Sequence, residues 1–579
     1  AARDAIVPSF DGTPLIVTLH PAEGLAPGQR APTILQTHGW GGSRETNPDA
    51  ASSEQTGNVG VGPLRRAGFN VLTWDSRGFG DSGGIVSVDG PDAEGRDVQA
   101  LLTWLAAQPE AKLDAPGDPR AGMHGVSYAG GIELVSAGLD RRIDVIAPTI
   151  AWHSLLTALY REDTAKSGWG TALYGAGKPA AEGDGLDSPA GPQTGGLDPH
   201  IDSAYASGVA TGKFSAADRA WFDSRGPGAL VENIRVPTFL VQGTADTLFT
   251  LSEAMRNAEI LQRHDVPIKM MWFCGGHGAC LTGSGPGGTI ERAVVAWMRR
   301  YLAGDTSVST GPQFEWLADD AVWRSTSSYP PPRGAPLTGD GSGTLGVNPA
   351  DALSGTPIAA GPAANAINVP IKVRPAQVAG EPVLTLTYTA TGTGASGHVF
   401  AQIVDGKRNL ALGNQVTPIP IAVDGAAHTV TRSLEGVAAA VGADSRYTLQ
   451  IVGGSQVYGP VRTTAMVTVS RAHVELPTVG GTIQTGRPGG VLTGGRRCTS
   501  RRRFVIHLRQ PRGQRLVSAR VTVAGKRVKV RRRHGRLTAV VNLQGKVKRT
   551  VRVRVVARTK TGRIVRETRR YRTCAGAPS

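Results

Sequence analysis

The first 310 or so residues alternate between short apolar runs and longer runs with helical spacing. PTILQTH (32–38), FNVLTWD (69–75) and VPTFLVQG (236–243) are mostly apolar and short, as buried strands are. DVQALLTWLAAQ (97–108) instead places its apolar residues three and four positions apart, which is the spacing of an amphipathic helix. Repeated alternation of this kind predicts a mostly parallel sheet with helices on its faces, and hence an α/β domain over residues 1–311.

One insertion interrupts this alternation. Residues 153–233 lie between two predicted strands and are too long for a single crossover helix. They contain helical patches such as HSLLTALY and SAADRAWFD, with several tryptophans and tyrosines. A long insertion at the carboxyl side of a sheet is typical of a cap over a pocket, so we expect a helical cap; the alternative is a disordered surface insertion.

From about residue 312 the pattern changes to that of an all-β protein. PPPRGAPLTGDGSGTLG (330–346) has the composition of a linker. It is followed by runs such as PVLTLTYTAT, in which apolar and polar residues alternate as they do in half-buried strands. We therefore expect a jelly-roll-like β-sandwich over 312–475, a glycine-rich linker over 476–495 and a small basic all-β domain over 496–579. No window of about 20 apolar residues occurs, so no membrane span is predicted.

Charge divides the chain into two unequal parts. The chain has 63 Lys and Arg against 46 Asp and Glu, a formal net charge of +17. Residues 496–572 hold 28 of the basic residues and a single acid, Glu567, so the rest carries 35 basic and 45 acidic residues. The basic part has only two aromatic residues, Phe504 and Tyr571, and no recognised nucleic-acid motif, which argues against nucleic acid as its partner. We expect it to contact an anionic cell-wall or membrane surface; the alternative is a charged module that only confers solubility.

The stretch MHGVSYAGG (123–131) has the composition of a sharp strand-to-helix turn. It places Ser127 among small residues, directly after an apolar run and directly before a helical one. A nucleophile elbow of the G-x-S-x-G type has this arrangement, because small neighbours let the chain turn closely and lift the serine hydroxyl out of the sheet. Here Ala129 replaces the last glycine and Gly130 follows it. The alternative is a glycine-rich turn that carries a solvated serine.

A nucleophilic serine needs a base and an acid that orients the base. In the α/β-hydrolase arrangement they follow in the chain order Ser, Asp, His, each after a strand. Asp246 follows VPTFLVQG and His277 follows IKMMWFCG, so both come in this order and at the same edge of the sheet. His38 and His124 are weaker candidates, because the first shapes a turn and the second lies inside a strand, and aspartates such as Asp218 are expected on solvated helix faces.

An oxyanion hole needs two backbone N–H groups aimed at one point. We expect one from Tyr128, the residue after the nucleophile, and the other from Trp40 in the glycine-rich loop HGWGGS. Trp40 can also form a wall of the pocket. This chemistry requires no metal and no organic cofactor.

The four cysteines can pair in three ways. We expect Cys274–Cys280 and Cys498–Cys574, because each pair brackets one compact segment; the alternative is four free thiols in a cytosolic protein. Neither pair has C-x-x-C spacing, so no zinc site is predicted. The sequence begins AARDAIVPSF without Met, as a secreted protein does after its signal peptide is removed. We therefore expect a secreted or extracellular protein that associates with the cell surface.

Residues 1 to about 475 resemble the X-Pro dipeptidyl-peptidase and cocaine-esterase family of serine hydrolases. The resemblance rests on GVSYAG, which matches the G-x-S-Y-x-G form of that family, on DSRGFGDSGG, which matches its D-x-R-G-x-G-x-S turn, and on VWRSTSSYPPP at the entry to the β domain. The order of an α/β-hydrolase domain, a helical cap and a jelly-roll-like domain is similar too. The resemblance implies that Ser127, Asp246 and His277 form a catalytic triad.

Two departures from the family pattern bear on the substrate. Trp40 stands where family members carry a tyrosine whose hydroxyl helps to hold the oxyanion, and no acid can be matched to the one that grips the free amine of a dipeptidyl-peptidase substrate. The sequence therefore predicts a secreted serine hydrolase that cleaves carboxylic esters, including polyesters. The alternatives are an X-Pro dipeptidyl-peptidase that cleaves peptide bonds after proline, and a cell-surface binding protein on a catalytically inactive hydrolase scaffold.

Overall fold

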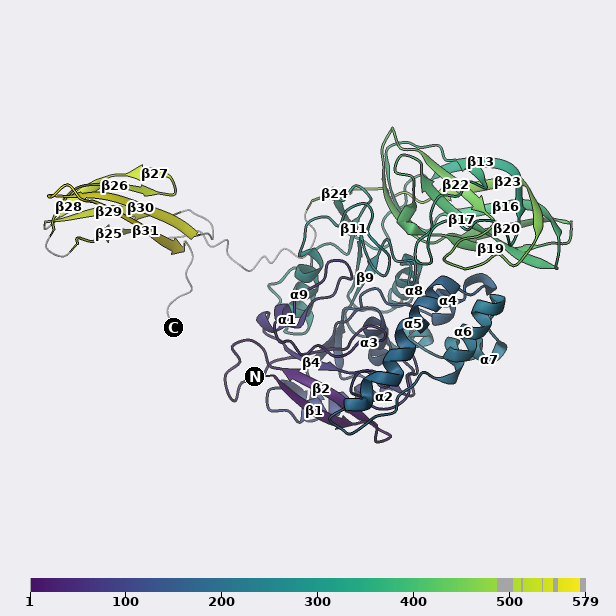
Figure 1. The fold of residues 1–579 in the computed structure, drawn as a ribbon, viewed down its shortest axis with the longest axis horizontal. Helices are drawn as coiled ribbons and strands as arrows, with labels where there is room; N and C mark the ends of the chain where they lie inside the picture. Colours follow the sequence, from purple (N-terminus) through teal and green to yellow (C-terminus); the bar gives the residue numbers. More distant parts are fainter. Residues whose placement is uncertain (1, 487–502, 512–513, 534, 545–549, 573–579) are drawn as a thin grey trace. The chain divides into compact units, whose positions relative to one another are not determined.

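The computed structural model describes residues 2–486, 503–511, 514–533, 535–544 and 550–572. The chain forms two compact units, one in residues 1–491 and one in residues 492–579 (Figure 1). The predicted bridge between Cys498 and Cys574 lies outside the described residues. Among the described residues, no helix has both the length and the hydrophobicity needed to cross a bilayer.

An eleven-stranded sheet forms the centre of the first unit. Its strands, in spatial order, are β1 (Arg3–Pro8), β2 (Pro14–His20), β4 (Asn70–Trp74), β3 (Thr33–Gln36), β7 (Ala121–Met123), β8 (Ile143–Ile146), β9 (Thr238–Gly243), β10 (Ile268–Phe273), β11 (Phe314–Leu317), β12 (Trp323–Thr326) and β24 (Gln484–Thr485). The run from β4 to β11 is parallel, and antiparallel strands extend it at both ends. A short hairpin of β5 (Leu113–Ala115) and β6 (Asp118–Pro119) stands apart.

Helices cover both faces of this sheet, as the alternating pattern predicts. The apolar residues of α2 (Glu94–Ala106), α3 (Tyr128–Leu139) and α8 (Leu251–Leu261) share one hydrophobic cluster with the strands. Those of α1 (Val61–Arg66) and α9 (Thr289–Tyr301) share another with the opposite face. The sheet is therefore buried on both sides, which explains why its strands are apolar runs rather than alternating ones.

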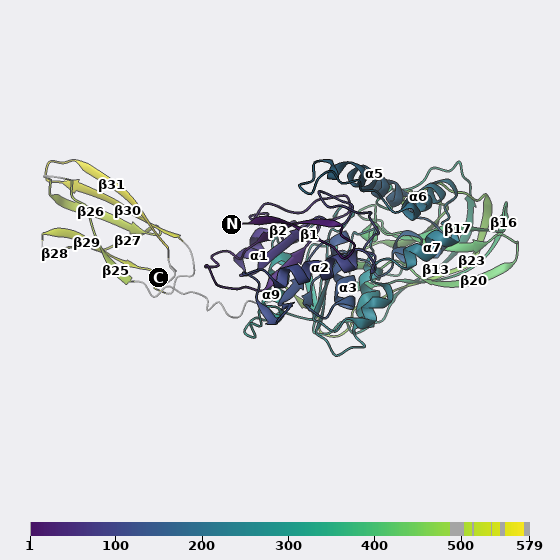
Figure 2. The ribbon, with the colours of Figure 1, turned by 90° about the horizontal axis from the view of Figure 1, so that it is seen from below.

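The insertion between β8 and β9 folds as a helical cap, which confirms that part of the predicted fold class. It contains α4 (Leu155–Leu159), η1 (Arg161–Asp163), α5 (Ser167–Gly183), η2 (Asp184–Asp187), α6 (Pro199–Thr211), α7 (Ala216–Asp223) and η3 (Gly228–Asn233). The four α-helices lie together beside the all-β part of the unit (Figures 1 and 2). Contacts fix them there, since Arg462 of the β part donates to the carbonyl oxygen of Val209 on α6 at 2.8 Å.

The all-β part is a sandwich of antiparallel sheets around its own apolar core. One sheet has the order β13 (Leu337–Val347), β23 (Ala465–Leu476), β16 (Val383–Gly392) and β20 (Ala427–Ser433). The other has β14 (Ala366–Pro370), β22 (Tyr447–Val452), β17 (Ser396–Asp405) and β18 (Leu410–Ala411), with η4 (Leu412–Asn414) next along the chain and β19 (Thr417–Ala422) paired to β17. A further pair is formed by β15 (Ala376–Gly380) and β21 (Val437–Val441).

The stretch with linker composition is in part a strand. β13 contains Gly339, Gly341 and Gly343, and a Cβ at the last two would lie 3.0 and 3.1 Å from side-chain atoms of Val369 and Ile367. Alternate glycines therefore leave room for the branched side chains of β14 across the sandwich. Composition alone predicts a flexible linker here. Only the contact with the facing strand β14 explains why these positions are glycine.

The end of the sheet lies later in the chain than residue 311. β11 and β12 follow that residue and still pair with β10 and with each other, and β24, which lies within 476–495, pairs with β12. The chain thus leaves the α/β sheet, forms the sandwich and returns to the sheet. The predicted boundaries at residues 311, 475 and 495 therefore do not coincide with the end of the α/β sheet. They remain a proposal about which segments fold as units.

The second unit consists of two small antiparallel sheets. One contains β25 (Arg503–His507), β29 (Arg536–Asn542) and β28 (Val530–Arg533), and the other contains β27 (Lys526–Val528), β26 (Leu516–Val523), β30 (Thr550–Thr559) and β31 (Ile564–Arg572). The inward residues, such as Val541, Val553 and Val555, form one core. The residues that alternate with these core residues along the strands face outward and are largely Arg, as the sequence pattern predicts.

Candidate active site

Ser127 occupies the turn between β7 and α3. Its backbone has φ 61° and ψ −119°, a conformation that costs of the order of 1–3 kcal/mol for a residue other than glycine. The turn is held because the N–H of Ser127 donates to the carbonyl of Thr149 at 2.9 Å. A Cβ on Gly125 would lie 2.5 Å from the Cβ of Ala129. The glycine at 125 is therefore what makes alanine acceptable at the last position of the motif.

The structure brings Ser127, His277 and Asp246 into one hydrogen-bonded row. Nε2 of His277 lies 2.7 Å from Oγ of Ser127, and Nδ1 of His277 donates to Oδ2 of Asp246 at 2.6 Å. Oδ1 of Asp246 accepts the backbone N–H groups of Leu248 and Phe249 at 3.0 and 2.9 Å. The carboxylate is fully buried, whereas the imidazole is 15% exposed. A carboxylate on Nδ1 fixes the tautomer in which Nε2 can accept the proton of the serine hydroxyl.

The loop that carries His277 is adapted to lie against the acid loop. Gly276 has φ +106°, and a Cβ there would lie 2.7 Å from the side chain of Asp246. A Cβ on Gly278 would lie 2.0 Å from the carbonyl oxygen of Ala245. A disulfide joins Cys274 and Cys280, as the sequence predicts, with a Cα–Cα distance of 5.3 Å. The disulfide thus joins the two ends of the loop that carries His277.

The imidazole of His277 is held between two aromatic side chains. Phe249 follows the acid loop, and Trp169 comes from helix α5 of the cap; their rings meet the imidazole edge to face, with centroids 5.1 and 5.9 Å away. Lys166, also from the cap, is buried and donates from Nζ to the carbonyl oxygens of Thr247 and Leu248 at 2.9 and 3.1 Å. Burial lowers the pKa of this ammonium. The cap therefore orients both the base and the acid loop.

The β-sandwich supports the same two loops. Nε2 of Gln415 donates to the backbone carbonyl of Asp246 at 2.8 Å, and Nδ2 of Asn414 donates to the carbonyl of Ala279 at 3.1 Å. Both amide side chains are buried. Because one strand-to-turn segment contacts the acid loop and the base loop together, it sets their separation.

Replacing Gln415 by Met tests this support. We expect kcat to fall about tenfold with little change in KM, since one buried hydrogen bond contributes about 1 kcal/mol and its loss lets the acid loop shift. Gln402→Met is the control, because its buried amide also donates to a carbonyl, that of Gly361 at 2.7 Å, and to Oε1 of Gln450 at 3.0 Å, but to neither of the two loops. Steady-state kinetics and thermal melts check the pair. Equal kcat values for the two variants would show that Gln415 acts on stability alone.

The two residues predicted to supply oxyanion donors line the same pocket as Ser127. Tyr128 is the first residue of α3, and Trp40 lies in the loop after β3; their rings are 5.5 Å apart. Within the described residues, neither backbone N–H donates to a protein acceptor. The indole Nε1 of Trp40 donates to the carbonyl of Leu173 on α5 at 2.8 Å. Since the side chain is engaged by the cap, any donor from Trp40 to an oxyanion is its backbone N–H.

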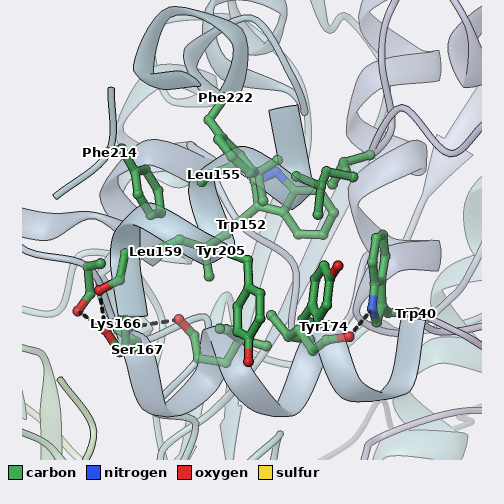
Figure 3. A pocket seen from close by; sticks show the side chains of 18 of the residues that line it. Trp40, Trp152, Leu155, Leu159, Lys166, Ser167, Tyr174, Tyr205, Phe214 and Phe222 are labelled. Carbon is green, nitrogen blue, oxygen red and sulfur yellow. Dashed lines mark hydrogen bonds between the residues drawn. The ribbon is translucent and has the colours of Figure 1, made fainter. Parts of the chain in front are cut away.

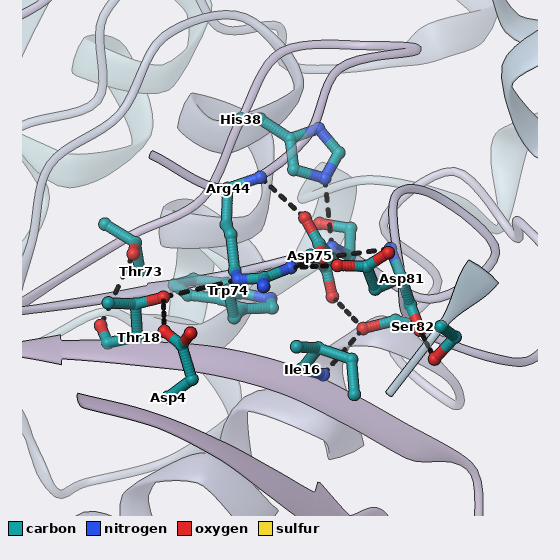
Figure 4. Close-up of polar contacts among 12 residues, drawn as sticks. Asp4, Ile16, Thr18, His38, Arg44, Thr73, Trp74, Asp75, Asp81 and Ser82 are labelled. Atoms are coloured by element: carbon teal, nitrogen blue, oxygen red, sulfur yellow. Dashed lines mark hydrogen bonds and ion pairs between the residues drawn. The ribbon is translucent and has the colours of Figure 1, made fainter. Parts of the chain in front are cut away.

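The D-x-R-G-x-G-x-S turn has a structural role that motif matching did not reveal. Asp75 accepts the backbone N–H of Arg44 at 2.6 Å and that of Asp81 at 3.0 Å, and its carboxylate also pairs with the Arg44 guanidinium (Figure 4). Nε2 of His38 accepts the N–H of Ser76 at 3.0 Å. These contacts tie the loop that carries Trp40 to the turn after β4, so His38 shapes this loop, as expected.

A buried acid pair lies behind Tyr128. Glu94 accepts the N–H groups of Ser87 and Gly90 at 2.6 and 2.8 Å and the phenol hydroxyl of Tyr128 at 3.3 Å. Burial raises the pKa of Glu94 to about 7 and that of the neighbouring Asp89 well above its usual range. Sequence spacing held no signal for this pair, since the two acids come together only where the loop before α2 folds under α3.

The remaining candidates are placed elsewhere. His124 is fully buried, donates from Nδ1 to the carbonyl of Ala147 and accepts the N–H of Val59 at Nε2; burial lowers its pKa to about 4. The sequence predicts a solvated helix face for Asp218, and this prediction is wrong. Asp218 is buried, and its Oδ1 accepts a hydrogen bond from Nδ1 of His200 at 2.9 Å. Among the described residues no three His, Cys, Asp or Glu side chains are grouped so that they could hold a metal ion.

An apolar pocket lies beside Ser127, between the sheet edge and the cap. In Figure 3, Trp40, Trp152, Tyr174 and Tyr205 surround the same space. Lys166 is the one charged residue among the lining residues that the structure describes, and its ammonium group is engaged by backbone carbonyls. The other lining residues are Val88, Ser127, Tyr128, Leu155, Leu159, Ala165, Ser167, Gly170, Leu173, Ile201, Ala204, Gly208, Val209, Phe214, Phe222, Leu248 and Phe249.

Part of the chain matches a known protein family. Residues 11–279 match the X-Pro dipeptidyl-peptidase family (S15 family). A curated Escherichia coli protein, described as an uncharacterised 31.7 kDa protein in the traX-finO intergenic region, is 28% identical over 121 residues, which are 21% of this chain and 37% of that protein. The match thus spans little more than a third of that relative.

Three solved structures share the fold across most of the chain. An alpha-amino acid ester hydrolase superposes with a TM-score of 0.62 at 13% identity, covering 83% of this chain and 96% of the other. An aminopeptidase from a marine sediment archaeon (Thaumarchaeota archaeon) gives 0.58 at 12% identity, with 83% and 96% covered. A CocE/NonD family hydrolase from Staphylococcus aureus gives 0.56 at 12% identity, with 82% and 93% covered. The predicted resemblance is confirmed: residues 11–279 of the chain match the X-Pro dipeptidyl-peptidase family (S15 family) of serine hydrolases, and most of the chain shares the fold of these three solved structures.

Proposed function

We propose that the protein is a secreted serine esterase that cleaves carboxylic esters through an acyl-enzyme on Ser127. The observation that carries this proposal is the row Ser127–His277–Asp246 at hydrogen-bond distances, beside an apolar pocket. His277 accepts the hydroxyl proton as Oγ attacks the ester carbonyl, and Asp246 stabilises the imidazolium that forms. The backbone N–H groups of Trp40 and Tyr128 hold the oxyanion. The proton passes to the leaving alcohol, and water then releases the acid by the same steps.

The lining of the pocket favours esters with an uncharged acyl group over X-Pro peptides. A dipeptidyl-peptidase must bind the free ammonium group of its substrate, and an unpaired ammonium in an apolar pocket is strongly unfavourable. None of the described residues that line the pocket is Asp or Glu. Asp89 and Glu94 lie behind Tyr128 and are not part of the lining, so they do not supply the missing partner.

A matched substrate panel tests the proposal. Each buried methylene contributes about 0.8 kcal/mol and hexanoate has four more than acetate, so we expect kcat/KM for p-nitrophenyl hexanoate to exceed that for the acetate by up to about 200-fold. The 6-aminohexanoate ester, which differs from hexanoate by a terminal ammonium, should be at least tenfold poorer. Gly-Pro-p-nitroanilide and its N-acetyl form should both be cleaved slowly. Fast cleavage of the free-amine form alone would instead support the X-Pro dipeptidyl-peptidase.

A charge placed in the pocket should weaken the preference for the longer acyl chain. Leu159 lines the pocket, and Leu159→Asp should lower kcat/KM for hexanoate at least tenfold while acetate changes less, because a long acyl chain must displace water from the new carboxylate. Leu186→Asp is the control, since Leu186 is an exposed cap residue, 58% accessible, that is not among the lining residues. A uniform loss over all esters for Leu159→Asp would mean that the pocket does not hold the acyl group.

The inactive-scaffold alternative makes the opposite prediction for an activity probe. A fluorophosphonate labels only an activated serine, so labelling of the full chain would exclude an inactive scaffold.

The secreted location is supported by the Cys274–Cys280 bridge, since disulfides persist in oxidising compartments. We extend the proposal to a surface-associated enzyme, with the basic C-terminal unit as the part that contacts the surface.

A further inference from the structure

We propose that one outer sheet face of the C-terminal unit is a docking surface for the anionic headgroups of a lipid bilayer. The face belongs to the sheet β27–β26–β30–β31, and we call it the arginine face. Directly opposite residues of an antiparallel ladder share a face, so the register assigns its members. Arg527, Thr522, Arg554 and Thr568 form one row, and Arg520, Val556 and Arg566 form the next.

The register adds two further rows. Arg552 lies opposite Arg570, and Ser518, Arg558 and Ile564 lie side by side. All seven arginines are exposed. Within the described part of the unit, none of the seven side chains donates to a protein acceptor, and the single acid, Glu567, shares the inner face with Val555 and pairs with Arg569.

This arrangement is unfavourable for the isolated unit. Like charges directly opposite one another destabilise a sheet, as Arg552 and Arg570 do here. A solubilising surface does not require this, since interspersed acids would keep the unit soluble without the repulsion. An external array of anions would relieve the repulsion, and guanidinium groups bind phosphate bidentately.

The shape of the face favours a planar surface over a polymer strand. The arginines occupy every row across four strands, an area of roughly 20 by 14 Å at normal strand spacing, rather than a line or groove. The aromatic residues Phe504 and Tyr571 lie opposite the core residues Val541 and Val551, so they face inward and cannot stack on bases. Val556 and Ile564, 41% and 47% exposed, lie among the arginines and are suited to enter the headgroup region.

Cosedimentation of the full chain with vesicles tests the proposal. At 0.1 M NaCl we expect binding to phosphatidylcholine vesicles that contain 30 mol% phosphatidylglycerol, no binding to pure phosphatidylcholine, and loss of binding at 0.5 M NaCl. Changing Arg552, Arg554 and Arg566 to Gln should weaken binding about 100-fold, since each arginine near an anionic membrane contributes about 1 kcal/mol.

A control with the same charge separates the face from net charge. Arg503, Arg531 and Arg533 are exposed on the outer face of the other sheet, and changing these three to Gln should weaken binding less than fivefold. Equal losses in the two triple variants would overturn the proposal. Hydrolysis of a p-nitrophenyl ester by each variant verifies that the first unit is intact and is independent of the docking result, and thermal melts of the two triple variants compare the folding of the second unit.

A second variant separates a bilayer from a soluble polyanion. Changing Val556 and Ile564 to Asn should lower vesicle binding about tenfold and leave retention on immobilised polyphosphate unchanged. If the wild-type chain binds polyphosphate in a manner that depends on Arg552, Arg554 and Arg566 but does not bind the vesicles, the occupant is a linear polyanion and the bilayer proposal is wrong.

Discussion

Replacing Ser127 by Ala should lower kcat for ester hydrolysis by about 10⁵- to 10⁶-fold and abolish labelling by a fluorophosphonate. The reason is that Oγ is the atom that bonds to the carbonyl carbon, and among the described residues it is the only hydrogen-bond partner of Nε2 of His277, at 2.7 Å. The oxyanion donors and the pocket remain, so a small rate above that of the uncatalysed reaction should persist. Burst kinetics should show no acyl-enzyme.

Ser136→Ala is the matched control for this change. Ser136 lies on α3, the helix that begins directly after Ser127, is buried, and its hydroxyl has no partner among the described residues. Removing that hydroxyl should leave kcat within about twofold. Should Ser127→Ala keep the rate of the Ser136→Ala variant, the assignment of the nucleophile is wrong.

Replacing Asp246 by Asn should lower kcat by about 10⁴-fold with little change in KM. The carboxylate accepts Nδ1–H of His277 and three backbone N–H groups, those of Leu248, Phe249 and His277. An amide NH₂ in place of Oδ2 cannot accept from Nδ1. The imidazole then takes the other tautomer, in which Nε2 carries the proton and cannot accept that of Ser127.

Asp218→Asn provides the comparison, because Asp218 is also buried and also accepts from a histidine, His200 at 2.9 Å, but within the cap. We expect it to lower stability by about 1 kcal/mol and to leave kcat within a few-fold. Steady-state rates and thermal melts of both variants check this. A drop in kcat of the same size for both would mean that the Asp246 effect arises from misfolding rather than from the tautomer of His277.

Much of the site could be predicted because it depends on local sequence and chain order. Ser127 was identified by glycines that the turn needs, and Asp246 and His277 by their positions just after apolar strands. The carboxyl ends of parallel strands meet at one edge of a sheet, so residues 150 positions apart in sequence were expected to meet, and Nε2 and Oγ lie 2.7 Å apart.

The supporting residues could not be predicted in the same way. Lys166 and Trp169 from the cap and Gln415 from the sandwich carry no motif, because each acts through a contact with a backbone carbonyl or a ring face. β13 reads as a linker for a similar reason, since its glycines make sense only against Val369 and Ile367 of the facing strand. A contact between two distant segments produces no periodic pattern in the sequence of either segment.

The sequence by itself determined the α/β class, the helical cap, the all-β parts and the three side chains of the row, because these follow from apolar periodicity, turn composition and the order of strands. The tertiary structure alone decided which residues hold that row in place, that the described residues lining the pocket beside it include no acid, and that seven arginines share one face of the last unit. The physical reason is that register, packing and burial are properties of pairs of segments, and a pair exists only after the chain has folded.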